Sequence, residues 1–178
     1  MARKSGVKLR ESFAKVRLFL SDVDGILTDA SVFMDQEREI KRFHVMDGLG
    51  LKLLRREGIK VGWISGRTSP ATLRRAHELQ IDFLFQDGGR KVDAAEKILK
   101  ETGFGWDQVC YMGDDILDLG MLRRAGVAVA VPQAVPEVKA AAHFITRRPG
   151  GHGAVREVVE RILKAQNRWA RLVEEYAA

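Results

Sequence analysis

The chain has 178 residues, of which 46% are hydrophobic and 30% charged, so it is large enough for one domain with a single buried core. Lysine and arginine outnumber aspartate and glutamate by 30 to 24, but the basic residues are scattered and match no nucleic-acid-binding motif. The one cysteine, Cys110, excludes an internal disulfide, and no apolar run reaches the ~20 residues of a membrane span. We therefore expect a cytoplasmic protein with no nucleic-acid or membrane partner.

The first predicted strand leads directly into acidic residues. Residues 16–23 form a short apolar run that includes β-branched side chains, which is typical of a buried strand. Asp22 lies at the carboxyl end of this run, and Asp24 directly follows it. Apolar and charged residues then alternate on both sides of a polar turn at 35–38, which predicts a β-hairpin within residues 30–44.

Strand and helix patterns alternate through the rest of the chain. Such alternation predicts an α/β fold, a Rossmann-like doubly wound parallel sheet with right-handed crossovers, and the hairpin is an insertion in it. No linker or repeat divides the sequence, so we expect one domain over residues 1–178, with residues 1–12 loosely ordered. Strands are predicted at 60–65, 83–86, 108–112, 127–131 and 144–146, and helices at 46–57, 70–80, 91–102, 116–125, 135–142 and 154–177.

The residues that directly follow the predicted parallel strands should meet, because the carboxyl ends of such strands border one crevice. Carboxylates that lie this close repel one another unless a cation lies between them, and a set of oxygen ligands selects Mg²⁺ rather than zinc. We therefore expect a magnesium site, with Ser65 and Lys91 left to bind a phosphate group. The residues of this set are Asp22, Asp24 and Gly25, the Ser65-Gly66-Arg67 turn, residues 87–91, and Gly113-Asp114-Asp115.

Two of these carboxylates are suited to phosphoryl transfer. A carboxylate beside a magnesium ion can attack phosphorus, because the metal and Lys91 neutralise the charge that keeps two anions apart. Asp22 can therefore form an aspartyl-phosphate. Asp24 lies two residues further on, at a turn, from where it can give a proton to the leaving oxygen and later take one from water. The sequence thus predicts Asp22 and Asp24 as the catalytic pair.

The same residues resemble the motifs of the haloacid dehalogenase superfamily of phosphotransferases. Residues 22–29 (DVDGILTD) are similar to its first motif, 65–67 (SGR) to its second, Lys91 to its third and 113–118 (GDDILD) to its fourth. The resemblance covers the chain from about residue 18 to residue 165.

This resemblance implies a role for each residue of the motifs. Asp22 would be the nucleophile and Asp24 the general acid and base. The resemblance also implies that the Asp22 carboxylate, the Asp24 carbonyl and Asp114 bind Mg²⁺. Ser65, Gly66 and Lys91 would bind the phosphoryl group. Asp115 and Asp118 would support metal-bound waters or Lys91.

Within the superfamily, the chain resembles the capless 3-deoxy-D-manno-octulosonate 8-phosphate phosphatases. The resemblance rests on Leu27-Thr28-Asp29, on the hairpin in place of a cap domain, and on residues 43–50 (FHVMDGLG) and 150–157 (GGHGAVRE). It implies a magnesium-dependent phosphatase whose partner is a small phosphorylated sugar acid. It also implies a homotetramer in which the hairpins pack together and a neighbouring subunit closes each site.

The sequence departs from this family at two positions. The hairpin turn at 35–38 lacks the glycine associated with the family. His152 stands where the family often has arginine, a residue suited to binding a carboxylate. We predict that His152 binds the substrate carboxylate when its imidazole is protonated, with Arg67 as a further substrate contact. One alternative is that His152 only packs within its loop while Arg67 or Arg148 binds the carboxylate. The alternative for Arg67 is that it forms a salt bridge.

Two other functions fit part of the same pattern. A phosphatase of a related nonulosonate 9-phosphate would keep the chemistry and change the substrate. A non-catalytic, receiver-like magnesium-binding module would also combine acidic residues with a lysine at a strand end. Asp24 distinguishes the enzyme from the receiver, because a hydrolase needs an acid and base near the nucleophile, whereas a stable phospho-acceptor does not.

Overall fold

The fold is built on one sheet of parallel strands. The computed structural model describes residues 6–35 and 38–177. The strands of the sheet are β1 (Leu18–Ser21), β4 (Lys60–Ile64), β5 (Phe83–Phe85), β6 (Val109–Met112), β7 (Val127–Ala130) and β8 (Phe144–Ile145). They pair in the order β5-β4-β1-β6-β7-β8, and every neighbouring pair is parallel. This confirms the predicted α/β fold.

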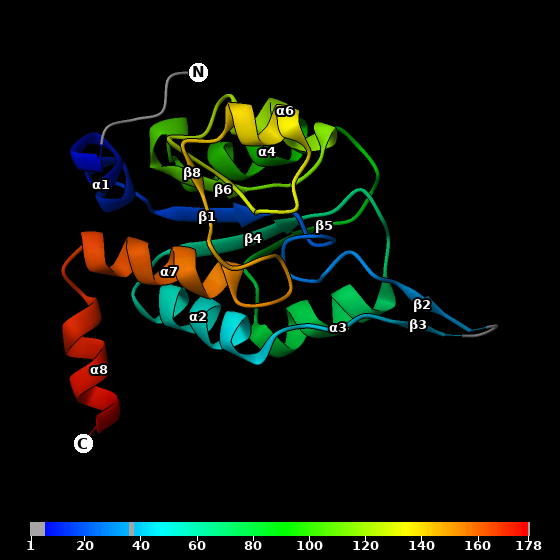
Figure 1. The fold of residues 1–178 in the computed structure, drawn as a ribbon, viewed down its shortest axis with the longest axis horizontal. Helices are drawn as coiled ribbons and strands as arrows, with labels where there is room; N and C mark the ends of the chain where they lie inside the picture. Colours follow the sequence, from blue (N-terminus) through cyan, green and yellow to red (C-terminus); the bar gives the residue numbers. More distant parts are fainter. Residues whose placement is uncertain (1–5, 36–37, 178) are drawn as a thin grey trace.

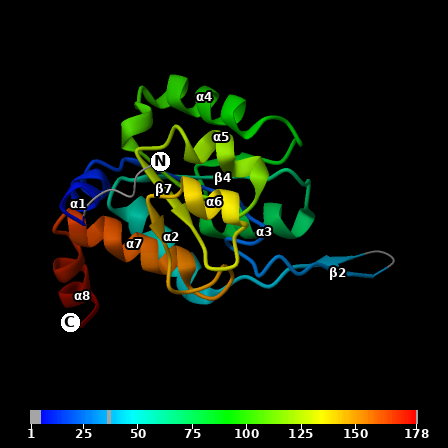
Figure 2. The same ribbon diagram turned by 45° about the horizontal axis from the view of Figure 1, so that its top comes forward.

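Helices cover both faces of the sheet, so the molecule has three layers (Figures 1 and 2). On one face lie α2 (Val45–Arg56), α3 (Pro70–Leu79) and α7 (Ala154–Ala165), and on the other lie α4 (Lys91–Thr102), α5 (Leu119–Leu122) and α6 (Pro136–Ala141). Every residue of β1, β6 and β7 is buried, as expected for parallel strands with helices on both sides.

The direction of the chain through the sheet reverses beside β1. The chain runs from β1 through β4 to β5, and then returns to β6 on the other side of β1. In the register of the sheet, Ser21 pairs with both Trp63 and Met112, so the residues that follow β1, β4 and β6 leave the sheet at the same edge. Ligands of open α/β sheets bind at such a reversal, which here lies between β1 and β6.

A small hairpin projects beyond the carboxyl ends of the strands (Figure 1). Strands β2 (Phe33–Met34) and β3 (Glu39–Ile40) pair in antiparallel fashion, with Phe33 opposite Ile40. Residues 36 and 37 of the predicted turn lie outside the described residues. The side chains of Phe33, Met34 and Ile40 are exposed, which is unusual for three neighbouring apolar residues.

The structure differs from the prediction at both ends of the chain. Residues 6–12, predicted to be loosely ordered, belong to helix α1 (Gly6–Ala14), whose Phe13 is buried; residues 1–5 lie outside the described residues. The single helix predicted at 154–177 is two helices, α7 and α8 (Trp169–Ala177). The break has a local cause, because Asn167 takes the left-handed conformation with φ 57°, which ends a right-handed helix.

A third difference concerns the segment predicted as a helix at 116–125. It forms a 3₁₀ turn, η2 (Ile116–Asp118), followed by the single-turn helix α5, and a similar turn, η1 (Trp106–Gln108), precedes β6. Among the described residues, no helix has the length and the apolar composition that crossing a membrane would require.

The start of helix α7 is capped by a side chain from another helix. Its N-cap residue, Gly153, has no side chain to accept a hydrogen bond. Asp47 of α2 replaces it: Oδ1 accepts from the Arg156 N–H at 2.7 Å and Oδ2 accepts from the Gly153 N–H at 3.3 Å. Asp47 thus satisfies two backbone donors that would otherwise be unpaired, and it holds the loop before α7 against α2.

Replacing Asp47 should therefore destabilise the fold. We expect Asp47→Ala to lower the free energy of unfolding by about 1–3 kcal/mol, because two buried N–H groups lose their acceptor. Chemical denaturation would measure this change. The matched control is Asp93→Ala, which changes an exposed side chain in the first turn of α4 and should alter stability by no more than about 0.5 kcal/mol. Equal effects of the two substitutions would contradict the capping role.

Candidate active site

Two carboxylates meet where the strand order reverses. Asp22 directly follows β1, and its N–H donates to the Met112 carbonyl at 3.0 Å, which fixes the end of β1 against β6. Asp114 lies in the turn after β6. Carboxylate oxygens of Asp22, Asp114 and Asp118 lie within 4.8 Å of one another. The structure therefore brings two of the predicted magnesium ligands together and adds a third acidic residue.

Asp118 is fully occupied by hydrogen bonds. Its Oδ1 accepts from Lys91 Nζ at 2.7 Å and from the Tyr111 hydroxyl at 2.6 Å. Its Oδ2 accepts from the N–H groups of Asp114 at 2.9 Å and Asp115 at 3.2 Å. A carboxylate with four donors has little left to offer a cation, so Asp118 acts as a buried support that positions Lys91 and the turn after β6.

Asp115 is not placed to support Lys91. Its side chain is exposed, and its Oδ1 accepts from the Ile116 N–H at 2.7 Å, so it caps the 3₁₀ turn η2 instead. The motif GDDILD thus offers two candidate supports for Lys91, and only the three-dimensional contacts identify Asp118 as the one that reaches it.

Asp114 is the carboxylate with space for a cation. Its Oδ1 is buried, and no group of the described residues donates a hydrogen bond to it. A Cβ built on Gly25 would lie 2.0 Å from Asp114 Oδ2, and Gly25 has a φ of 93°, so both the turn and the space require glycine here. A buried oxygen that lacks a donor, next to the Asp22 carboxylate, fits the ligand set of Mg²⁺.

Burial changes the acidity of these groups. Burial raises the pKa of Asp22 to about 6, against the opposing effect of the Lys91 ammonium, whose Nζ lies 3.0 Å from Oδ2. Burial also raises the pKa of Asp114 to about 7, and the nearby Asp22 and Asp118 contribute. Burial alone would lower the pKa of Lys91, but Asp118 and Asp22 outweigh this effect, so its pKa is raised and it stays charged. The cluster therefore carries more negative than positive charge.

Asp24 is directed towards a different cation. Lys41 Nζ donates to Asp24 Oδ2 at 2.9 Å and lies 2.8 Å from Oδ1. Lys41 comes from the segment after β3, and the analysis of the sequence missed it. A signal was present, because Glu39, Lys41 and Phe43 alternate along an extended segment and so point to the same side.

The second predicted motif forms a tight turn after β4. Ser65 is buried, and its Oγ accepts from the Arg67 N–H and donates to the Arg67 carbonyl, both at 3.1 Å. The Arg67 guanidinium lies 2.8 Å from Glu39 Oε2, so the salt-bridge alternative is the arrangement in the structure. Glu39 also accepts a short hydrogen bond from Ser69 Oγ, which ties the hairpin to the start of α3.

The glycine-rich loop at 150–153 packs on the segment that follows Asp24. The Gly151 N–H donates to the Ile26 carbonyl at 3.0 Å, and a Cβ on Gly150 would lie only 1.7 Å from the Gly25 carbonyl oxygen. His152 at the tip is exposed.

Arg42 bridges His152 to Asp29. One of its guanidinium nitrogens, Nη2, lies 2.9 Å from His152 Nε2 and 2.9 Å from Asp29 Oδ2. A guanidinium only donates, so Nε2 accepts in this contact. The structure thus places the guanidinium of Arg42 beside His152, and Arg42 was not among the residues predicted from the sequence.

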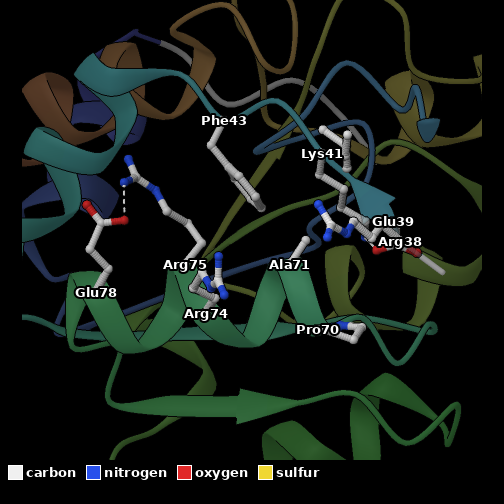
Figure 3. Close-up of a pocket in the computed structure, with 10 residues that line it drawn as sticks. Arg38, Glu39, Lys41, Phe43, Pro70, Ala71, Arg74, Arg75 and Glu78 are labelled. Carbon is white, nitrogen blue, oxygen red and sulfur yellow. Dashed lines mark hydrogen bonds and ion pairs between the residues drawn. The ribbon is translucent and has the colours of Figure 1, made fainter. Parts of the chain in front are cut away.

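A cavity of about 760 Å³ is lined in part by Lys41, the residue that contacts Asp24. Figure 3 shows it between the segment after β3 and helix α3, with Phe43 between Lys41 and Arg75. Its walls are basic at Arg38, Arg74 and Arg75 and apolar at Ile40, Phe43, Pro70 and Ala71, with Glu39 and Glu78 as the acidic members. The Asp22 and Asp114 carboxylates lie outside this lining.

The raised pKa values predict how metal binding depends on pH. Carboxylic acids must lose their protons to bind Mg²⁺, so protons compete with the metal below the pKa of about 7 at Asp114 and about 6 at Asp22. We expect the Kd for Mg²⁺ to rise roughly 20-fold as the pH falls from 8 to 6, because both carboxyl groups must lose their protons. Isothermal titration calorimetry in buffers of different ionisation enthalpy would also count the protons released.

Two variants make this measurement specific. Asp114→Asn should abolish Mg²⁺ binding, whereas Asp107→Asn, an exposed aspartate that precedes β6 at the opposite edge of the sheet, should leave it unchanged. A Kd that does not depend on pH, or binding that survives in Asp114→Asn, would place the metal elsewhere.

Comparison with known proteins relates the chain to one group of enzymes. A sequence model of the haloacid dehalogenase-like hydrolases matches residues 83–158. The 3-deoxy-D-manno-octulosonate 8-phosphate phosphatase of Yersinia pestis is 39% identical over 156 residues, which are 87% of this chain and 83% of that protein. The enzyme of the same name from Haemophilus influenzae is 37% identical over 161 residues, which are 90% of this chain and 89% of that protein.

Solved structures agree with these matches. The 3-deoxy-D-manno-octulosonate 8-phosphate phosphatase from Moraxella catarrhalis, crystallised with magnesium ion, phosphate ion and KDO, superposes with a TM-score of 0.93 and 38% identity. The match covers 97% of this chain and 99% of that one. The chain therefore belongs to the 3-deoxy-D-manno-octulosonate 8-phosphate phosphatase family of haloacid dehalogenase-like hydrolases.

Proposed function

We infer that the protein is a magnesium-dependent phosphatase that hydrolyses 3-deoxy-D-manno-octulosonate 8-phosphate. The observation that carries this inference is the meeting of Asp22, Asp114 and Lys91 where the strand order reverses. The relatives from Y. pestis and H. influenzae, which carry the name of this activity, support the substrate, and the M. catarrhalis relative was crystallised with magnesium, phosphate and KDO.

Magnesium would be held by the carboxylates of Asp22 and Asp114 and by the main-chain carbonyl of Asp24. The buried Asp114 Oδ1 without a donor supports this assignment, because it is the kind of oxygen that a cation satisfies. When bound, Mg²⁺ would neutralise the charge of the phosphoryl group and of the carboxylates, so that two anions can approach each other.

Asp22 is the proposed nucleophile. Its Oδ2 faces Lys91 Nζ at 3.0 Å and its Oδ1 accepts from the Val23 N–H at 2.7 Å, so the carboxylate is held in one orientation at the end of β1. In the first half of the reaction, a bond forms between an Asp22 oxygen and phosphorus, while the bond from phosphorus to the sugar oxygen breaks. Asp24 gives a proton to that oxygen, and the sugar acid leaves as an alcohol.

Water completes the reaction. It attacks the phosphorus of the aspartyl-phosphate and gives a proton to Asp24, the bond from phosphorus to the Asp22 oxygen breaks, and inorganic phosphate leaves. Asp22 is then a carboxylate again and Asp24 is protonated again. Ser65, the Gly66 N–H and Lys91 are the proposed donors to the phosphoryl oxygens during both halves.

The sugar-acid part of the substrate is proposed to lie against basic side chains at the rim. Three arginines line the cavity beside Lys41, and Arg42 lies against His152. A carboxylate is attracted to such a surface, and arginine can bind it through two parallel hydrogen bonds. Arg67 and His152 stay proposed substrate contacts, with Arg42 added as the cation nearest to His152.

Turnover with different phosphates tests this function. We expect the protein to release phosphate from 3-deoxy-D-manno-octulosonate 8-phosphate and from p-nitrophenyl phosphate, and to lose both activities in EDTA. Asp22→Asn should lose roughly 10³-fold or more in kcat while it still binds substrate, because the bonding oxygen is no longer a nucleophile.

Three results would contradict parts of this proposal. A higher kcat/KM for a nonulosonate 9-phosphate than for 3-deoxy-D-manno-octulosonate 8-phosphate would agree with the proposed reaction but not with the proposed substrate. Stable phosphorylation of Asp22 without release of phosphate would indicate a receiver-like module. Near-normal activity of Asp22→Asn would remove Asp22 as the nucleophile.

We also propose that the protein is a cytoplasmic homotetramer in which hairpins from different subunits pack together. The exposed side chains of Phe33, Met34 and Ile40 support this assembly, because apolar side chains gathered on one projecting hairpin favour burial against another copy. The buried, unpaired thiol of Cys110 suits a reducing compartment.

Light scattering would measure the proposed assembly. The wild-type protein should have a mass close to four times the 19.9 kDa of one chain, and Phe33→Asp should reduce it, because a charge in the apolar contact opposes burial. The control is Val7→Asp, which puts a charge on the equally exposed helix α1, far from the hairpin (Figure 1). A wild-type monomer, or the same mass change in both variants, would overturn the assembly.

A further inference from the structure

Lys41 is a buried charged residue whose contacts all lie on the Asp24 side of the site. Its side chain has no exposed surface. Besides the two Asp24 oxygens at 2.8 and 2.9 Å, its Nζ meets Thr72 Oγ1 of α3 at 3.3 Å and Glu39 Oε1 at 3.8 Å. The ammonium group is therefore enclosed by three oxygen-bearing side chains from three different elements.

Burying an ammonium group is costly unless a partner compensates for it. The desolvation of one charge costs several kcal/mol, and the loss is recovered only where an opposite charge lies at good geometry. Asp24 provides this charge and is itself only partly covered, with 21% of its side chain exposed. The pair thus has a fully covered member, Lys41, and a partly exposed one, Asp24, which stays accessible for the proposed proton transfer.

We propose that Lys41 is a positioning residue that holds the Asp24 carboxylate in the orientation required for proton transfer to the leaving oxygen. This inference rests on the proposed phosphatase function. A carboxylate at the start of a turn can rotate about two side-chain bonds, and a fixed ammonium group between its two oxygens restricts both rotations. Lys41 acts through Asp24 and not on the phosphoryl group.

The contacts of Glu39 connect the segment that carries Lys41 to the turn after β4 and to helix α3. Glu39, two residues before Lys41, is bound by Arg67 of the turn after β4 and by Ser69 at the start of α3. Figure 3 shows Lys41 and Glu39 side by side above helix α3. The hairpin segment is thus fastened at Glu39, and Lys41 extends from this fastened segment to Asp24.

A leaving-group comparison separates positioning from general support of the structure. p-Nitrophenolate needs almost no proton to leave, whereas the sugar alkoxide depends on one, and kcat/KM reports only the steps up to transfer of the phosphoryl group. We expect Lys41→Met to lower kcat/KM roughly 10- to 100-fold for 3-deoxy-D-manno-octulosonate 8-phosphate and less than about threefold for p-nitrophenyl phosphate. Asp24→Asn should give the same kind of difference between the two substrates.

A double-mutant cycle makes the test stricter. In an Asp24→Asn background, Lys41→Met should lower kcat/KM for the sugar-acid phosphate by less than about twofold, because the residue it positions is already inactive. Thr72→Val removes one contact of Lys41 without touching Asp24, and it should cause a smaller loss with the same substrate dependence. Lys60→Met on the exposed edge of β4, paired with Asp82, is the control that should leave both substrates unaffected.

The outcomes distinguish this inference from the proposed function. Equal losses for the two substrates in Lys41→Met, or a full further loss in the Asp24→Asn background, would overturn the positioning role while wild-type turnover keeps the phosphatase function. If Lys41→Met does not fold, as circular dichroism and thermal denaturation would reveal, Thr72→Val decides the question in the same two assays. No turnover by the wild-type protein would instead refute the function on which the inference rests.

Discussion

The arrangement of Lys91 between Asp22 and Asp118 is the interaction on which the site depends. The lysine and Asp118 are buried, so each charge needs its partners to offset the loss of water. Asp118 obtains them from Lys91, Tyr111 and two backbone N–H groups, which fastens α4, β6 and the turn after β6 to one carboxylate. The parallel register of β1 and β6 then brings Asp22 to the same lysine.

The same arrangement explains why this group of carboxylates needs a cation to balance its charge. Three carboxylates share one ammonium group, and Asp114 is the one whose buried Oδ1 receives no hydrogen bond from the described residues. Burial, together with the nearby Asp22 and Asp118, raises the pKa of Asp114 to about 7, so near neutral pH a proton or a metal ion must balance its charge. The metal affinity and the acidity of the site therefore depend on the same burial and the same neighbouring charges, and a substitution that changes one changes the other.

The parts of this site that the sequence predicted are those fixed by local pattern. A buried strand followed by charged residues places Asp22 and Asp114 at one edge, because the edge of a parallel sheet is determined by strand direction alone. The contacts of Lys41 and the capping of α7 by Asp47 join residues that are far apart in the sequence. Asp47 and Arg156, for example, are separated by 109 positions, and no periodicity of the sequence indicates such contacts. At Asn167 the local pattern led to a wrong prediction. The apolar pattern continues across this residue and predicts one helix, but the left-handed conformation of Asn167 divides it into two.

The hairpin contacts the two proposed catalytic residues unequally. Asp22 is held entirely by the sheet and its helices, through Met112 and Lys91, whereas Asp24 is held by Lys41 at the base of the hairpin. Arg42, the next residue, reaches Asp29 and His152. A contact that moves this segment would therefore change the position of Asp24, the proposed proton-transferring group, and of Arg42 beside His152 together, while Asp22, the proposed nucleophile, stays fixed. This segment thus provides a physical route by which a contact at the hairpin would affect proton transfer without touching the proposed phosphoryl site.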